Sequence, residues 1–421
     1  SSRAPLPRNR NSLLKNILKY LKNHRGFYPI AAPSRNTPTV VAWVMTQTPV
    51  YEVVVVGGGP AGLTTALYAT RLGHRTALVN REGGRYERVS SVHNLLGVSE
   101  ETTGGEVTEL GIDQLEEYGA DYYPEDVREV ARVESPDSTD FENESDDTQF
   151  RVSGESVTLR ADRVVLATGF TDTPPNVRDL RQFTGRGLHY CLHCDAYTLG
   201  DEPVFVLGRD DHAAEMAMML LNFTDDVDLL LNDDEPTWSD DAAAQVEAHP
   251  VSVVGDRVDH AFADRDPERG TDTAERGNDT DHGNETDPWL GGLEFADGHT
   301  REYGGGFAVY GKEYNNELAA DLGCDLREDG AIAVDDDRET SVSGVYAVGD
   351  VTHGQNQTPI SLGDGASAGI ALHKDLRQFP VAADELDRLD GLDAPAMADD
   401  LRARMWRVRE TDDHAGMTPE E

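Results

Sequence analysis

Two cysteines and an aspartate stand together in the segment Cys191-Leu192-His193-Cys194-Asp195. Cysteines separated by two residues can close a small disulfide ring and open it again. A position at a helix start would favour the thiolate, which is the nucleophile of thiol–disulfide exchange. Asp195 follows at once and is suited to pass protons to or from the thiols. We therefore interpret Cys191, Cys194 and Asp195 as candidate catalytic residues.

The same cysteines allow a second interpretation, half of a zinc site with His189 and His193 as further ligands. A structural zinc site normally has a second pair of ligands at similar spacing, and Cys324 is the one remaining cysteine of the three in the chain. We therefore favour the redox pair and predict no metal. Cys324 is interpreted as a small buried apolar residue.

A glycine motif lies upstream, between a predicted strand of four valines and a helix rich in Ala and Leu. In Gly57-x-Gly59-x-x-Gly62, the first glycine permits a tight turn and the second lets a pyrophosphate approach the backbone. The third lets the helix pack on the strand. Pro60 and Ala61 begin the helix, whose N-terminus favours phosphate charge. A strand–helix turn without a ligand is the alternative, but the flanking elements favour a dinucleotide site.

The next predicted strand covers residues 75–80. Dinucleotide sites usually carry an acidic residue at the end of this strand, where it binds the adenosine ribose. The chain has Asn80 at that place. An amide can still bond a hydroxyl, so we predict that Asn80 contacts the ribose.

Composition limits the partners of this chain. Its 421 residues can bury two ordinary cores, so we expect two domains or one domain with an insertion. With 79 acidic and 37 basic residues, the net charge is -42, which repels nucleic acid and anionic membrane surfaces. After Met45 the only lysines are Lys312 and Lys374. An acidic surface nearly free of lysine indicates a halophilic protein, because concentrated salt would screen the self-repulsion.

The compartment follows from weaker signals. No run approaches eighteen apolar residues, so we expect no membrane span. Three cysteines are too few for a secreted disulfide framework, and two of them lie in the C-x-x-C pair. We therefore expect a cytoplasmic protein.

Residues 1–44 differ from the rest of the chain, because they contain eight Lys or Arg and no Asp or Glu. Five apolar residues between Leu13 and Leu21 could line one helix face, which is typical of a membrane-surface segment. The alternative, which we favour, is that Met45 is the true start and the upstream residues are disordered or non-native. Neither half of the segment resembles a signal peptide.

The remaining chain divides by its apolar patterns into four further parts. Residues 45–171 form the first segment of a nucleotide-binding domain, with an acidic loop at 134–148. Residues 172–308 begin a second strand–helix–strand unit, and 263–288 are too polar to fold. Residues 309–380 return to the first domain. The last part, 381–421, is an acidic tail with one short helix over 395–409.

Together these motifs resemble a known family, the low-molecular-weight thioredoxin reductases, flavoproteins of the pyridine nucleotide-disulfide oxidoreductase class. The resemblance extends from about Met45 to Leu376, and all five motifs occur in the family's order. They are Gly57-Gly58-Gly59-Pro60-Ala61-Gly62, His93-Asn94-x-x-Gly97, Ala167-Thr168-Gly169, Cys191-x-x-Cys194-Asp195 and Gly344-Val345-Tyr346-Ala347-Val348-Gly349-Asp350. The resemblance implies an α/β fold with an FAD-binding Rossmann-like three-layer domain. A second NAD(P)-binding-like domain that carries the C-x-x-C pair would be inserted at 172–308.

The resemblance also implies FAD and gives residues roles toward it. The glycines of the first motif would hold the pyrophosphate, and Asn94 would lie beside the isoalloxazine ring. Asp350 would bond the ribityl chain or phosphate, and Gln357 and Thr358 would face the pyrimidine edge. The full set of implied cofactor ligands is Gly57, Gly59, Pro60, Ala61, Gly62, Asn80, Asn94, Thr168, Gly169, Gly349, Asp350, Gln357 and Thr358.

The chain departs from the family where NADPH should bind. In place of the second glycine motif it has Gly208-Arg209-Asp210-Asp211-His212-Ala213, so two glycines are replaced and two carboxylates face the pyrophosphate position. Like charges near 4 Å cost about 1 kcal/mol in water and about four times as much at a partly shielded site. The next strand ends Leu231-Asn232-Asp233-Asp234-Glu235, without the cations that would bind a 2′-phosphate. These departures argue against NADPH as the electron donor.

Three functions remain open. We favour a flavin-dependent dithiol–disulfide oxidoreductase, a homodimer by the resemblance, that reduces thioredoxin or a similar small protein. Cys194 would exchange electrons with the flavin and Cys191 would attack the external disulfide, with reduced ferredoxin as a candidate donor. The second hypothesis is a dithiol oxidase that passes electrons from FAD to oxygen. The third is a non-catalytic flavin-binding redox sensor.

Overall fold

The computed structural model describes residues 48–81, 83–133, 149–264, 288–377, 379–381, 386 and 397–416. It also gives the backbone of two short strands, β1 (Phe27–Pro29) and β2 (Trp43–Met45), which pair antiparallel. The rest of the basic segment 1–44 lies outside the described residues. So do the acidic loop 134–148, nearly all of the polar run 263–288 and most of 381–396.

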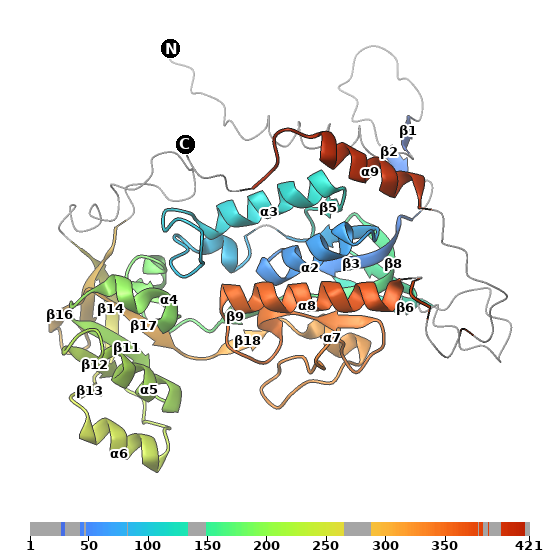
Figure 1. Cartoon of the computed structure of the whole chain (residues 1–421). Coiled ribbons are helices and arrows are strands. Elements are labelled where there is room, and N and C mark those ends of the chain that lie inside the picture. Colours follow the sequence, from blue (N-terminus) through green and yellow to red (C-terminus); the bar gives the residue numbers. More distant parts are fainter. Residues whose placement is uncertain are drawn as a thin grey trace, which may run out of the picture.

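A seven-stranded sheet organises the larger lobe (Figure 1). Its order is β5-β4-β3-β8-β7-β6, and β19 pairs with the end of β8. The neighbours β3, β4, β5, β8 and β19 run parallel, whereas β6 and β7 form an antiparallel extension on β8. The bounds are β3 (Val50–Val56), β4 (Thr76–Val79), β5 (Asp121–Tyr123), β6 (Glu129–Val133), β7 (Gln149–Ser153), β8 (Thr158–Leu166) and β19 (Val345–Ala347).

Both faces of this sheet are covered, which explains the unbroken run of valines in β3. Val53 and Val55 face a layer of three helices, and Val54 and Val56 face a second core built from the antiparallel strands and a short helix. The helices lie side by side, and close approach of α2 and α8 requires Gly365, because a Cβ there would meet the Ala61 carbonyl at 2.3 Å. The helices are α2 (Pro60–Arg71), α3 (Gly104–Tyr118), α8 (Thr358–Leu376) and, on the opposite face, α7 (Glu317–Leu322).

The smaller lobe contains a five-stranded sheet in the order β10-β17-β11-β12-β13, all of it parallel. One face packs on helices, and the other packs on a three-stranded antiparallel sheet. Its strands are β10 (Leu188–His189), β11 (Val204–Gly208), β12 (Val227–Leu230), β13 (Ser252–Val254) and β17 (Gly305–Val309). The helices are α4 (Leu192–Asp195), α5 (Asp211–Leu220) and α6 (Asp240–Ala248), and the antiparallel strands are β14 (Val258–Ala263), β15 (Leu290–Phe295) and β16 (Thr300–Glu302).

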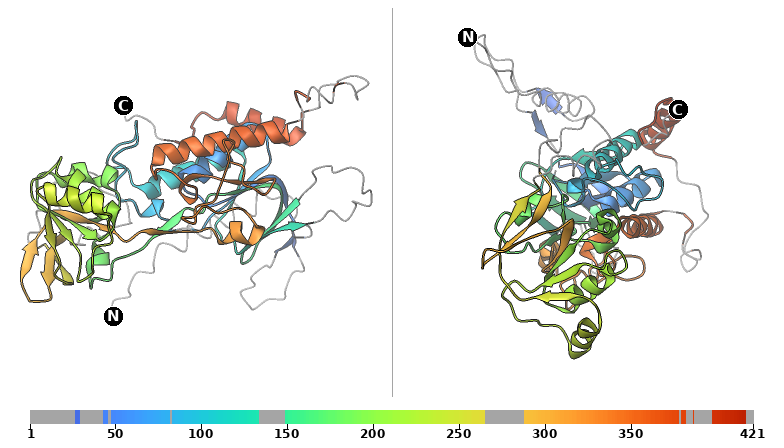
Figure 2. Two further views of the ribbon diagram at one scale, coloured as in Figure 1. Left: turned by 90° about the horizontal axis from the view of Figure 1, so that it is seen from below. Right: turned by 90° about the vertical axis from the view of Figure 1, so that its left-hand side faces the viewer.

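The chain crosses between the lobes twice, and the two crossings pair with each other. β9 (Phe170–Asp172) leads out of the larger lobe, and β18 (Lys312–Tyr314) leads back in antiparallel to it. Figure 2 shows the two lobes joined by these segments. The α/β fold with a second α/β unit inserted in the first is therefore confirmed, and 172–308 remains our proposed extent of the insertion.

The tail carries the expected short helix, α9 (Asp399–Glu410), which begins four residues later than predicted. It lies against α3 (Figure 1), and the segment after it continues this contact, because Gln114 donates to the Ala415 carbonyl at 3.0 Å. In the described part of the chain, no helix combines the length and apolar character needed to cross a membrane.

Candidate active site

The two cysteines are joined in a disulfide, with Cα atoms 5.3 Å apart. Cys191 is the N-cap of α4, and Cys194 lies within that helix, as predicted for a pair at a helix start. However, α4 has only four residues and continues as the 3-10 turn Ala196–Leu199. A single turn sums few peptide dipoles, so the helix contributes less to thiolate stability than we expected.

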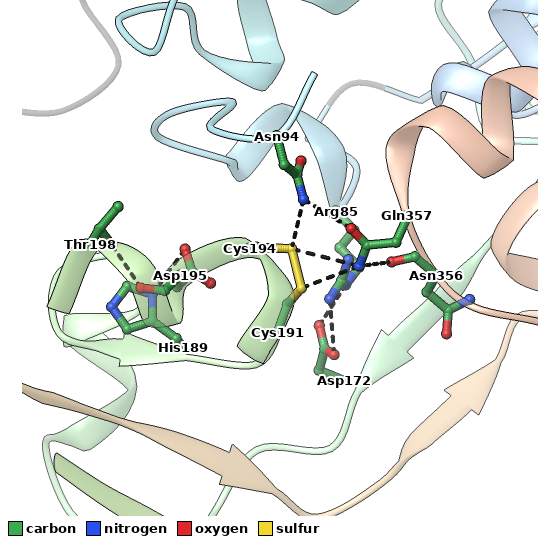
Figure 3. The surroundings of a disulfide bond; sticks show 10 residues. All are labelled: Arg85, Asn94, Asp172, His189, Cys191, Cys194, Asp195, Thr198, Asn356 and Gln357. Carbon is green, nitrogen blue, oxygen red and sulfur yellow. Dashed lines mark hydrogen bonds and ion pairs between the residues drawn. A yellow bond between two sulfur atoms is a disulfide. The ribbon is translucent and has the colours of Figure 1, made fainter. Parts of the chain in front are cut away.

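Side-chain amides from the larger lobe take the place of that helix dipole (Figure 3). Gln357 Nε2 lies 3.5 Å from Cys191 Sγ and 3.9 Å from Cys194 Sγ. Asn94 Nδ2 lies 3.9 Å from Cys194 Sγ and donates to Gln357 Oε1 at 2.9 Å. Amide donors directed at sulfur favour the thiolate over the thiol. The structure thus brings Asn94 and Gln357 to the reacting atoms, although 263 residues separate them.

Asp195 faces away from the amides, toward a buried histidine. Its Oδ1 lies 3.3 Å from His189 Nδ1, and His189 is 7% exposed. Figure 3 shows this pair on one side of the disulfide and the two amides on the other. The carboxylate is therefore held beside the redox pair by a second ionisable group.

The glycine turn has the conformation that its sequence predicts. Gly57 has φ +108°, and a Cβ there would lie 2.3 Å from the Ala167 carbonyl oxygen. A Cβ on Gly62 would lie 2.0 Å from the Gly57 carbonyl oxygen, so the helix closes directly on the turn. Around Gly59, in contrast, a Cβ would meet nothing within 4 Å. The first and third glycines are required by the fold itself, and the second leaves open space for a ligand.

The start of α2 is prepared for an anion. Gly59 is its N-cap, no side chain caps the helix, and no acidic residue lies in the first turn. Free N–H groups and the positive end of the dipole therefore face the open space beside Gly59. The surroundings of the turn fit the pyrophosphate of a dinucleotide such as FAD.

Asn80 lies where the ribose contact was expected. Its Oδ1 accepts from the Gly58 N–H at 2.8 Å, which fixes the amide beside the turn. Its Nδ2 is buried and has no hydrogen-bond partner among the described residues. A buried donor without a partner is costly, and a ribose hydroxyl would satisfy it. The sequence did not single out Gly58, yet a Cβ there would lie 2.5 Å from Asn80 Cγ.

The second segment of the larger lobe reaches the same turn. A Cβ on Gly349 would lie 2.6 Å from Ala61 Cβ, so the two motifs are in contact. Asp350 accepts from the Ser361 hydroxyl at 3.0 Å and lines a cavity of about 200 Å³. Arg338, which the sequence did not single out, lines this cavity and binds Asp364 at 2.6 Å. Burial raises the pKa of Asp364, although the neighbouring Arg338 opposes that effect.

Two predicted cofactor ligands have other contacts. The Thr168 hydroxyl donates to the Asn315 carbonyl at 2.6 Å, and Asn315 Nδ2 donates to the Thr168 carbonyl at 2.8 Å. Gly169 accepts from the Asn315 N–H at 3.0 Å. These hydrogen bonds connect the segment that leaves the larger lobe before β9 to the segment that returns to it after β18. Thr358 is the first residue of α8, directly after Gln357.

The matching place in the smaller lobe has carboxylates at the helix start. Asp210 caps α5 by accepting from the Ala213 N–H at 2.9 Å, and Asp211 accepts from the Ser239 N–H at 2.7 Å. Arg209 is held by Asp234 at 3.5 Å, and its carbonyl accepts from the Thr237 N–H at 2.7 Å. The 237–239 segment therefore lies over the glycine-poor loop, and carboxylates occupy the helix start. These residues do not fit a pyridine nucleotide pyrophosphate.

Comparisons with known proteins agree with this geometry. The chain is 28% identical over 327 residues to one of the subunits of the Staphylococcus aureus alkyl hydroperoxide reductase, and the match covers 76% of this chain and 58% of that protein. It thus spans a little more than half the length of this relative. Its structure is similar to HlmI, at 29% identity and TM-score 0.66, over 77% of this chain and 92% of that one. The structure is also similar to the thioredoxin reductase of Streptococcus pyogenes, at 24% identity and TM-score 0.66. This match covers 79% of this chain and 100% of that one.

The family model described as pyridine nucleotide-disulphide oxidoreductase matches residues 51–369, from the first strand of the larger lobe through the glycines of α8. The matched range includes the glycine turn, the disulfide and Asp350. Membership implies an FAD site, in agreement with the open turn and with the Asn80 Nδ2, which has no partner among the described residues. The chain belongs to the pyridine nucleotide-disulphide oxidoreductase family.

Proposed function

We propose that this chain is a flavin-dependent dithiol–disulfide oxidoreductase that reduces a thioredoxin-type disulfide through Cys191 and Cys194. The observation that carries the proposal is the contact of Gln357 with both sulfur atoms. Gln357 is the N-cap of α8, and α8 packs on α2 beside the open glycine turn. This arrangement supports a redox pair that lies beside the site we propose for FAD.

FAD, when bound, would supply or accept the pair of electrons that opens or closes the disulfide. The α2 N-terminus would hold its pyrophosphate, Asn80 its adenosine ribose and Asp350 its ribityl or phosphate oxygens. Asn94 and Gln357 would stabilise the negative charge that develops on sulfur when the disulfide is opened. The protein thereby provides the orientation and the electrostatics of the reaction.

The exchange with substrate requires both cysteines. The Cys191 thiolate attacks one sulfur of the external disulfide, whose S–S bond breaks as a mixed disulfide forms. The Cys194 thiolate then attacks Cys191, restores the internal disulfide and releases the second substrate thiol. The substrate disulfide is reduced by two electrons, and the enzyme dithiol is oxidised by two. Both cysteines are half-buried, so the partner has to present its disulfide at this surface.

We infer further that NADPH is not the donor. Asp210 already occupies the helix N–H group to which a pyrophosphate would bind, and Asp211 adds a second negative charge. Reduced ferredoxin, a protein that delivers electrons without a nucleotide site, is our candidate donor. We also propose a homodimer.

The test is an anaerobic titration of the purified protein in concentrated KCl, with NADPH and separately with reduced ferredoxin. We expect ferredoxin to bleach the flavin absorbance and NADPH to leave it unchanged. Rapid bleaching by NADPH would refute the inference about the donor alone. A protein that takes up no FAD would refute the function. Cys191→Ser is the matched control, which should still be bleached but should not reduce thioredoxin.

The carboxylates at the start of α5 also favour a second function, dithiol oxidation by oxygen. An enzyme without a site for a soluble reductant can take its electrons from thiols, in which case a dithiol becomes a disulfide and oxygen becomes hydrogen peroxide. Oxygen uptake with a small dithiol, at a rate faster than thioredoxin reduction, would support this function. No turnover with any thiol partner would support the redox sensor instead.

A further inference from the structure

His189 is a buried histidine beside the redox pair that neither the glycine motifs nor the C-x-x-C pair explains. It lies on β10, opposite Phe307 of β17, with ring centroids 5.8 Å apart. Its Nδ1 lies 3.3 Å from Asp195 Oδ1, and its Nε2 is buried without a hydrogen-bond partner among the described residues. An imidazole with one nitrogen unsatisfied is costly to bury as a purely structural group.

The charged surroundings of this imidazole are simple. Over the part of the chain that the structure describes, Asp195 on α4 is the one charged side chain that pairs with His189, and β17 contributes an uncharged ring. Asp195 follows Cys194 directly, and its N–H donates to the Cys191 carbonyl at 3.2 Å. Asp195 therefore belongs to the same helical turn as both cysteines.

We propose that His189 is a positioning residue that orients the Asp195 carboxylate and shares one proton with it during thiol–disulfide exchange. The pair takes the proton of the Cys191 thiol and leaves the thiolate, which attacks the substrate disulfide. It returns the proton to the substrate thiolate that leaves when the S–S bond breaks. The Cys194 proton follows the same route to the second substrate sulfur when Cys194 attacks Cys191. Both protons and both electrons of the enzyme dithiol thereby pass to the substrate. The inference rests on the proposed exchange function.

The test measures only the exchange between the reduced enzyme and a disulfide substrate, without an electron donor for the flavin. The protein is reduced with excess dithiothreitol, desalted without oxygen and mixed with a small aromatic disulfide whose released thiolate absorbs light. The rate is recorded between pH 5 and 8, where an ordinary imidazole changes its charge. Because the enzyme dithiol supplies the electrons, the result does not depend on the donor. No exchange at any pH in the unchanged protein would refute the proposed function rather than the role of His189.

Two substitutions separate orientation from proton transfer. His189→Asn can still donate a hydrogen bond to Asp195 but does not titrate, so we expect it to lose the pH dependence while it retains most of the rate. His189→Ala removes both the hydrogen bond and the titratable ring, and we expect a rate about tenfold lower at pH 7. This loss is smaller than the 10²-fold or more that general acid–base catalysis typically contributes, because Asp195 is still present. Asp195→Asn removes the carboxylate itself and should lower the rate by about 10²-fold.

The double variant of His189→Ala and Asp195→Asn provides the decisive comparison. If the histidine acts through the carboxylate, the double variant reacts no more slowly than Asp195→Asn alone. A loss equal to the product of the two single losses would overturn the proposal. So would a His189→Asn pH profile that overlays that of the unchanged protein. His212→Asn, at an exposed histidine of α5, is the matched control and should change neither rate nor profile. If His189→Ala fails to fold, His189→Asn still decides the outcome.

Discussion

Gly59→Ala separates binding of the cofactor from stability of the fold. Gly59 has φ -71° and ψ 177°, an extended conformation that alanine adopts without strain. A methyl group there would meet no protein atom within 4 Å. It would, however, project into the space where we propose that a pyrophosphate approaches the helix start. The substitution should therefore leave the protein folded and weaken the binding of the flavin.

The expected magnitudes follow from these contacts. Replacing glycine by alanine at a compatible position stabilises a protein by about 0.4–1 kcal/mol, because the unfolded chain loses freedom. Alanine is a poorer N-cap than glycine, and we estimate that this offsets about 0.5–1 kcal/mol. The free energy of unfolding should therefore change by less than about 0.5 kcal/mol. Loss of one hydrogen bond to a charged phosphate costs about 1.5–3 kcal/mol, which weakens FAD binding about 10- to 150-fold.

The assay compares FAD affinity and thermal unfolding of the same preparations. Gly255→Ala is the matched control, because a Cβ there also meets nothing within 4 Å but lies in the smaller lobe. Gly62→Ala is the opposite control, since its Cβ would lie 2.0 Å from a carbonyl oxygen and should destabilise the fold. Unchanged FAD affinity in Gly59→Ala would show that the pyrophosphate does not approach this residue.

Three further perturbations test other parts of the structure. Gln357→Glu places a negative charge near Cys191 Sγ, where Gln357 Nε2 now lies at 3.5 Å. It should raise the pKa of that thiol by about 1–3 units, because like charges at 4 Å cost about 1–4 kcal/mol. The rate of cysteine alkylation, recorded against pH in the reduced protein, measures the pKa. Asp228→Asn weakens the acceptor of the buried Tyr303 hydroxyl, now at 2.6 Å, and should destabilise the fold by about 1–3 kcal/mol in denaturant titrations. Burial raises the pKa of Asp228, so this group's contribution to stability falls as pH rises from about 3.9 through the folded pKa. The variant should lack that fall. Finally, raising KCl from 0.1 M to 1 M shortens the Debye length from about 10 Å to about 3 Å and should raise the melting temperature of this chain of net charge -42; no rise would contradict a halophilic protein.

The two lobes differ in the side chains at the start of the helix that follows the corresponding strand. Both contain a parallel strand followed by a helix, β3 with α2 and β11 with α5. In the larger lobe the helix start has no side-chain cap. In the smaller lobe Asp210 caps it and Asp211 binds the covering segment. The difference lies in a few side chains at the helix start, and it reverses the charge that a phosphate would meet.

The sequence by itself determined the elements whose geometry is local. The spacing of Gly57, Gly59 and Gly62 predicted the turn, and the C-x-x-C spacing predicted a closed ring at a helix start. The replaced glycines of the second motif predicted carboxylates at the second helix start, and that NADPH is not the donor remains a prediction. In each case the backbone conformation and the local charge depend on residues close together in the sequence. The order of residues therefore suffices to predict these local features.

Only the tertiary structure decided which distant groups meet at the disulfide. Gln357 lies 166 residues from Cys191 and was expected at the flavin edge, yet its amide contacts both sulfurs. His189 was considered only as a zinc ligand and instead binds Asp195. The Gln357 contact depends on how α4 docks against the larger lobe, and the His189 contact depends on how α4 packs on β10 within the smaller lobe. Spacing in the sequence cannot specify them, because a pairing between two surfaces leaves no periodic pattern in either segment.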